Sequence, residues 1–204
     1  MSEKLLETVR KWFGDAVLEV HSAHGDDTAV IAASRWREVA RFLRDDPGCQ
    51  MNMLVDLCGV DFPDREPRFE VVAHLHSLSL GHRLRIKTRV GDREGDGAKL
   101  DSLVPVWPGA DWFERETWDL MGIRFVGHPD LRRILLYEEF EGHPLRKDYP
   151  ADKTQPLVPY REGADVLGKL QPFGDDEGMS FGRNAFPLEH KDQATSDGRS
   201  REPS

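Results

Sequence analysis

The chain has 204 residues, a formal net charge of −9 at pH 7, an apolar fraction of 38% and a charged fraction of 32%. This length accommodates one domain and an extension, and the acidic balance argues against nonspecific nucleic-acid binding, which requires a basic surface. The N-terminus lacks the apolar region of a signal peptide, and no apolar run approaches the ~20 residues of a membrane span, so a soluble chain of cytoplasmic type without direct membrane insertion is expected.

The first quarter of the chain shows helix and hairpin patterns. Apolar residues at helical spacing predict a helix over residues 2–13. Two short apolar runs on either side of a polar turn predict a hairpin within residues 16–33. A second helix is expected over residues 34–46, with Ser34 as its N-terminal cap.

Three further segments are typical of strands. Residues 49–63 form an apolar run of strand length that ends at a turn, and residues 69–76 and 83–90 alternate between apolar and polar side chains. Together with the hairpin they predict about five strands. The expected fold class is therefore α+β, a two-layer structure with a mostly antiparallel or mixed sheet and helices on one face.

The chain changes character after Pro150. Residues 151–204 hold five of the 13 prolines and six of the 18 glycines, so this segment cannot build a core of its own. It carries single, separated aromatic residues, which are Tyr160, Phe173, Phe181 and Phe186. We predict a domain over residues 1–150 and then a strap over residues 152–187, each ring filling a pocket of a neighbour. The alternative is a plain disordered tail, which composition favours for residues 193–204.

The segment between the sheet and the extension is dense in charge. A helix is predicted over residues 111–121, and Glu116 falls between apolar residues on one face of it. A buried carboxylate needs a cation or several hydrogen bonds, and we expect Glu116 to pair with one of the arginines after Pro129. Arg115 and Asp119 are four residues apart and are expected to pair with each other, whereas Glu114 is expected on the outer face.

A short pattern occurs twice after this helix. "GHPDLRR" begins at Gly127 and "GHPLRK" begins at Gly142. Glycine permits a turn with positive φ and proline restricts the residue before it, so each copy would present a histidine at a rigid corner with cations beyond it. The alternative is two ordinary loops, with histidines whose hydrogen bonds are satisfied within the chain and with surface ion pairs that contribute ~0–1 kcal/mol each.

The charged segment resembles a known family. "ERETWDLMGIRFVGHPDLRRIL" is similar to the signature of the C subunit of the proton-pumping NADH-quinone oxidoreductase, the counterpart of the 30 kDa subunit of respiratory complex I. "VDFP", "PGADWFERE" and "LRKDYP" are also similar to the family, so the resemblance covers most of residues 5–150. The positions that fill the signature are Glu114, Arg115, Glu116, Asp119, Leu120, Met121, His128, Arg132, Ile134 and Leu135.

The resemblance implies a non-catalytic subunit of the peripheral arm. Such a subunit packs against the quinone-site D subunit and other cluster-bearing subunits, on the cytoplasmic side of the inner membrane. The complex carries electrons from NADH through FMN and iron–sulfur centres to quinone and pumps protons, and its cofactors lie in partner subunits. The expected signature and interface residues are Glu114, Arg115, Glu116, Asp119, His128, Arg132, Arg133, His143, Arg146, Lys147, Asp148 and Tyr149.

The residues themselves agree that this chain carries no redox cofactor. Cys49 and Cys58 are the only cysteines, and their spacing matches no iron–sulfur, haem or zinc motif. The sequence has neither a dinucleotide-binding glycine motif after a strand nor a phosphate-binding loop. No catalytic, cofactor-binding or metal residue is therefore expected.

Two alternatives stay open at this point. One is the equivalent subunit of a related membrane-bound hydrogenase, which shares the signature, although such relatives are often fused to the D-like partner and this chain ends at Ser204. The other is a small metalloenzyme, because His74, His76 and His82 lie on or beside neighbouring strands and could bind zinc. Nearby arginines oppose a bound cation, which counts against the metal site.

Overall fold

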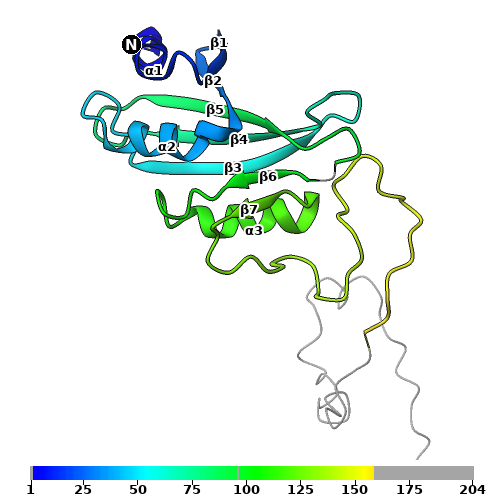
Figure 1. The fold of residues 1–204 in the computed structure, drawn as a ribbon. Coiled ribbons are helices and arrows are strands. Elements are labelled where there is room, and N and C mark those ends of the chain that lie inside the picture. Colours follow the sequence, from blue (N-terminus) through cyan, green and yellow to red (C-terminus); the bar gives the residue numbers. More distant parts are fainter. Residues whose placement is uncertain (1, 96, 159–204) are drawn as a thin grey trace, which may run out of the picture. The chain divides into compact units, whose positions relative to one another are not determined.

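The computed structural model describes residues 2–95 and 97–158 (Figure 1). The chain divides into two units, residues 1–157 and 158–204, and nearly all described residues belong to the first. The predicted anchors Tyr160, Phe173, Phe181 and Phe186, and the segment 193–204, lie outside the described residues.

The first unit is an α+β structure, which confirms the predicted fold class. Its helices are α1 (Ser2–Phe13), the 3-10 turn η1 (Ala33–Arg35), α2 (Trp36–Asp45) and α3 (Ala110–Met121). Its strands are β1 (Val17–Ala23), β2 (Asp26–Ile31), β3 (Met53–Asp61), β4 (Phe69–His76), β5 (Arg83–Val90), β6 (Lys99–Asp101) and β7 (Arg124–Val126). Among the described residues, no helix has the length and apolarity needed to cross a bilayer.

Five strands form one mixed sheet in the order β1-β2-β5-β4-β3. β2 and β5 run parallel, and the other neighbours are antiparallel. Alternation along β5 places Leu84 and Ile86 in the core and the intervening Arg85 and Lys87 on the opposite face. A pleated strand separates successive side chains in this way, so the period-two pattern of the sequence identified the buried face correctly.

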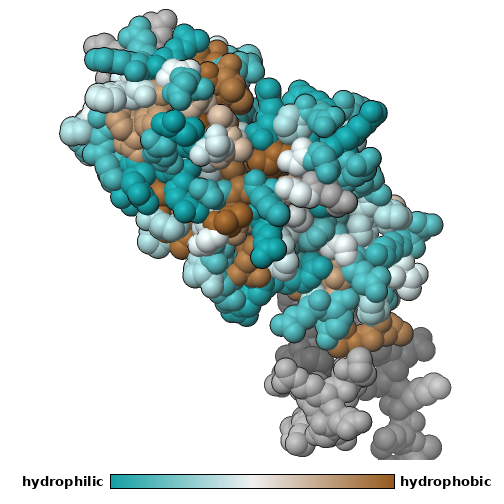
Figure 2. Space-filling model, viewed as in Figure 1, coloured by the Kyte–Doolittle hydropathy of each residue, from teal (hydrophilic) through white to brown (hydrophobic). Residues whose placement is uncertain are grey.

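The helices contribute to a single core on that buried face. Leu5 and Val9 of α1 and Trp36 and Leu43 of α2 belong to the same apolar cluster as the inward side chains of the sheet. Figure 2 shows that hydrophilic residues cover most of the visible face of this unit, with apolar residues in patches between them. The residues of the sequence signature lie in the segments after β5.

Two local features differ from the sequence-based expectations. Ser34 does not cap α2, because it lies inside η1, where the N–H of Arg35 bonds the carbonyl of Ala32 at 3.0 Å. The turn satisfies these N–H groups through backbone carbonyls, so no side-chain cap is needed. A second, two-stranded parallel sheet joins β6 and β7, and strands of three residues are too short to give a pattern.

A glycine lets α3 approach the edge strand β3. An added Cβ at Gly59 would lie 2.6 Å from the Met121 sulfur and 3.2 Å from both the Thr117 methyl and Ile123. Close contact between a helix and a strand requires the missing side chain here. Gly122 then ends the helix with a φ of 78°, as predicted. α3 is therefore held at a defined position beside the sheet (Figure 1).

Candidate functional site

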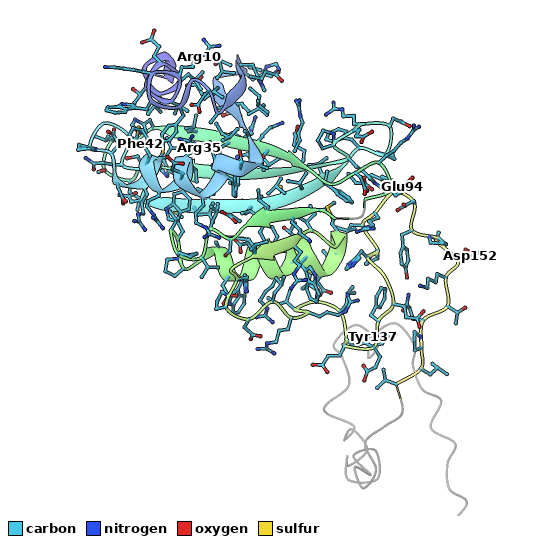
Figure 3. The ribbon with its side chains drawn as sticks, viewed as in Figure 1. Arg10, Arg35, Phe42, Glu94, Tyr137 and Asp152 are labelled. Atoms are coloured by element: carbon cyan, nitrogen blue, oxygen red, sulfur yellow. The ribbon has the colours of Figure 1, made fainter. Side chains whose placement is uncertain are left out.

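The charged segment folds as α3, the short strand β7 and an irregular chain that runs along the helix from its first turn to its last. This chain covers residues 127–150 and contains Tyr137, which is marked in Figure 3. Backbone groups in irregular chain need partners outside a regular ladder. Charged side chains of the signature supply most of those partners.

Asp119 is the centre of this arrangement. Its buried side chain accepts the N–H groups of residues 134–136 at Oδ2, over 2.9–3.0 Å. Its Oδ1 lies 2.6 Å from Nη1 of Arg133. Burial alone would raise the pKa of Asp119, but these N–H groups and Arg133 outweigh burial and hold the pKa below its usual range. The carboxylate therefore stays charged and fixes three successive backbone groups.

The arginines of the signature also bind backbone. Arg115 donates to the carbonyls of Arg132 and Arg133 at 3.2 and 3.0 Å, and Arg133 donates to the carbonyl of Phe140 at 2.7 Å. The expected pair between Arg115 and Asp119 is therefore wrong. Backbone groups of the irregular chain bond to both side chains, so Arg115 and Asp119 do not pair with each other.

The two histidines of the repeated pattern hold the two ends of α3. Nε2 of the buried His128 lies 3.0 Å from the Asp111 carboxylate in the first turn, and its Nδ1 accepts the Asp130 N–H. Nδ1 of His143 lies 2.9 Å from the Asp119 carbonyl near the last turn. Burial lowers the pKa of His143. Both glycines have the positive φ expected of a turn, and both histidines have partners within the chain and contact one helix.

A buried ion network holds the end of the irregular chain against the sheet. Nε and Nη2 of Arg68 contact both oxygens of Asp61 at 2.7 and 2.8 Å, and Nη1 contacts Asp148 at 2.8 Å. The Lys147 N–H donates to Asp61 at 2.8 Å. The Arg68 hydrogen bonds hold the pKa of Asp61 below its usual range. Sequence analysis missed Arg68, although an arginine directly before an alternating apolar strand was an available signal.

Three further predicted interface residues are Arg146, Tyr149 and Arg132. Arg146 donates to the carbonyls of Met121 and Gly95 at 2.7 and 3.2 Å. The Tyr149 ring stacks on Phe140 at 6.2 Å between centroids. Arg132 is exposed and bonds only to the neighbouring Asp130, at 2.8 Å, through its side chain. Arg146 and Tyr149 thus fix the irregular chain as Arg133 does, whereas Arg132 does not.

Glu114 and Glu116 have the opposite roles to those expected. Glu114 is fully buried and accepts the N–H of Leu103, whereas Glu116 is exposed and forms no ion pair with any residue that the structure describes. Trp112, which helical spacing places on the same face as Glu116, is 68% exposed. The prediction for Glu114 and Glu116 was wrong because the chain packed on α3 is irregular. Such a chain can bury charged and apolar side chains alike, so the spacing of apolar residues does not identify the buried face.

One of the histidines that suggested a metal site has another partner. Nε2 of His82 lies 2.7 Å from the Cys49 carbonyl. Burial and the nearby Arg85 lower the pKa of His74. Within residues 2–95 and 97–158, no group of three His, Cys, Asp or Glu side chains is arranged to hold a metal ion.

Comparisons with known proteins agree with the signature. The family model described as "Respiratory-chain NADH dehydrogenase, 30 Kd subunit" matches residues 29–155. The chain is 46% identical over 162 residues to the NADH-quinone oxidoreductase C subunit, copy 2, of Rhizobium etli, covering 79% of this chain and 78% of that protein. It is 50% identical over 172 residues to the NADH-quinone oxidoreductase C subunit of a Roseiflexus species, covering 84% and 96%.

A solved structure shares the fold. It is described as "Nqo5 of the trypsin-resistant fragment (1-134)" and aligns with a TM-score of 0.53 and 29% identity. The alignment covers 63% of this chain and 98% of that one. The resemblance seen in the sequence is thereby confirmed.

Asp119→Ala should strongly destabilise the protein, because it leaves Arg133 and three N–H groups without their acceptor. We expect a loss of ~3–5 kcal/mol in the free energy of unfolding, measured by urea melts. Glu116→Ala on the same helix is the matched control and should cost about 0.5 kcal/mol or less. Equal losses for the two variants would contradict the assignment of Asp119 as the centre.

Glu114 should make stability depend on pH. Burial raises its pKa from the ordinary 4.5 to about 7, against hydrogen bonds from Ser102 and Leu103 that favour the charged form. The contribution of protonated Glu114 to the free energy of unfolding is fully present below pH 4.5 and is lost as pH rises through 7. The reason is that the unfolded chain releases this proton at a lower pH than the folded chain does. This contribution amounts to roughly 3 kcal/mol.

Glu114→Gln should remove this contribution. The variant should lose less stability than the parent between pH 5 and pH 8, as measured by urea unfolding at both values. If the variant and the parent lost the same stability between pH 5 and pH 8, the pKa of Glu114 would not be raised in the folded protein.

Proposed function

Because the chain belongs to the family of the 30 kDa subunit of the respiratory-chain NADH dehydrogenase, we propose that it is a structural, non-catalytic subunit of an NADH-quinone oxidoreductase of the complex I type. The enzyme carries electrons from NADH through FMN and iron–sulfur centres to quinone and couples this to proton translocation. In this proposal the cofactors belong to partner subunits and this chain binds none. It lies peripherally on the cytoplasmic side of the inner membrane.

The proposed role is to pack against the quinone-site D subunit and neighbouring cluster-bearing subunits. The observation that carries it is the use of Asp119 and its neighbours: buried charges hold an irregular segment in one shape. A segment without regular secondary structure presents a fixed surface only when its backbone groups are satisfied. Such a preformed surface suits a subunit that must position others, because less ordering is required on binding.

The test compares two activities in membranes from cells that lack this chain. NADH oxidation with quinone as the acceptor should be lost, whereas NADH oxidation with ferricyanide should persist in the separate flavin-containing part. The full chain, supplied again, should restore quinone reduction. Hydrogen-dependent activity lost in place of NADH-dependent activity would instead identify the hydrogenase counterpart. A flavin or iron–sulfur spectrum in the purified chain would contradict the non-catalytic role.

The predicted strap gives a separate prediction. The first residues after Pro150 contact the domain: Gln155 exchanges hydrogen bonds with the backbone of Glu141 at 2.8 and 3.2 Å, and the Tyr137 hydroxyl donates to the Pro156 carbonyl. A truncation should therefore keep these residues. Cutting after Val158 should change the melting temperature of the free protein by no more than about 2 °C.

The same truncation should sharply reduce co-purification with the quinone-site D subunit, because it removes Tyr160, Phe173, Phe181 and Phe186. Cutting after Leu188 is the control and should leave both properties unchanged. A chain that ends at Val158 and binds its partner as well as the full chain does would show that there is no strap.

A further inference from the structure

One side of α3 is left open by its neighbours. Thr117 and Met121 face β3, Glu114 faces Leu103, and Asp119 faces the irregular chain. At 100° per residue, Trp112, Glu116 and Leu120 are one helical turn apart and form a stripe between the side of Asp119 and the side of Thr117. Trp112 is 68% exposed, and Glu116 is also exposed. A large exposed aromatic residue is more typical of a binding surface than of a solvated face.

A hollow of about 260 Å³ adjoins this side. It lies between residues 56–59 of β3 and the helix, and Leu145 closes one end. The Leu145 N–H bonds the Leu120 carbonyl at 3.0 Å, which fixes this wall, although 51% of Leu145 remains exposed. Leu57, Leu120 and Met121 make much of the lining apolar. The volume suits one side chain and falls below that of ordinary small-molecule sites.

Two carboxylates line this hollow, those of Asp56 and Glu116. Neither makes an ion pair in the part of the chain that the structure describes, whereas Glu114 and Asp119 on the same helix are both engaged. Lys87 lies on the same sheet as Asp56, but it is paired with Glu70 at 2.9 Å. The hollow therefore combines a partly apolar lining with two carboxylates that make no ion pair with a described residue.

We propose that this hollow, with the open side of α3, binds an arginine side chain from another subunit of the complex. The inference rests on the proposed function, since the arginine comes from a neighbouring subunit. The aliphatic part of the side chain packs on Leu120 and Leu145, and the guanidinium group pairs with Asp56 and Glu116. Arginine suits the site because its planar group bonds carboxylates through several donors and its stem is apolar. Trp112 then covers the contact from water, as aromatic residues do in interfaces.

The first test is Glu116→Lys in the full-length chain. Co-purification of this variant with the complex should fall roughly tenfold or more, because a buried interfacial charge pair is replaced by repulsion. The melting temperature of the free protein should stay within about 2 °C, since Glu116 has no described partner. Glu116→Gln should give a smaller loss of binding. Glu7→Lys makes the same charge change at an exposed position of α1 and should have no effect.

The second test places the photo-crosslinker p-benzoylphenylalanine at position 112 of the assembled complex. Irradiation should join this position to a peptide of another subunit that contains an arginine. A crosslink to this chain, or to a peptide with no basic residue, would overturn the inference. Normal incorporation of Glu116→Lys into the complex would also overturn the inference. A lower melting temperature of the free Glu116→Lys protein would overturn it too, because it would mean that this chain itself fills the hollow.

These outcomes separate the two proposals. Failure of the wild-type chain to co-purify with an NADH-quinone oxidoreductase would overturn the proposed function, and the inference with it. Incorporation of the wild type and of Glu116→Lys to equal extents would overturn the inference alone.

Discussion

The structure depends on one carboxylate that organises chain without regular secondary structure. Asp119 meets three consecutive N–H groups and one guanidinium from a buried position. A buried charge is costly unless every lone pair is used, and here the partners come from a segment that has no ladder of its own. The helix and the segment are thus stabilised together: without the segment Asp119 is an unpaired buried charge, and without Asp119 the segment loses its acceptors.

A second anchor joins this assembly to the sheet. Asp61 at the end of β3 and Arg68 before β4 hold the backbone of Lys147 and the carboxylate of Asp148. One anchor holds residues 133–136 and the other holds residues 147 and 148, so the path of the irregular segment is fixed at two places. Because most charges of the signature are engaged within the chain, few remain for a partner. Density of charge in a sequence is therefore a poor guide to which residues meet another protein.

Sequence analysis succeeded where side-chain periodicity matches a regular neighbour. Strict alternation over residues 83–90 identified β5 and its buried face, and helical spacing located α3. It failed for Glu114 and Glu116, because the groups facing α3 include the N–H of Leu103 and the backbone of residues 134–136. Backbone groups carry no signal in the sequence, so their partners cannot be found from periodicity. Arg68 was missed for a different reason: its partners are the side chains of Asp61 and Asp148, and no periodicity links it to Asp148, 80 residues away.

That separation has a consequence for how the protein forms. Asp61 and Arg68 leave the ribosome long before residues 147 and 148, and closing a loop of that length is entropically unfavourable until both ends are ordered. Since chains are synthesised from the N-terminus, Asp61 and Arg68 can meet Lys147 and Asp148 only after the sheet and α3 have been synthesised. The contacts that fix the end of the irregular segment therefore belong to a late stage of synthesis.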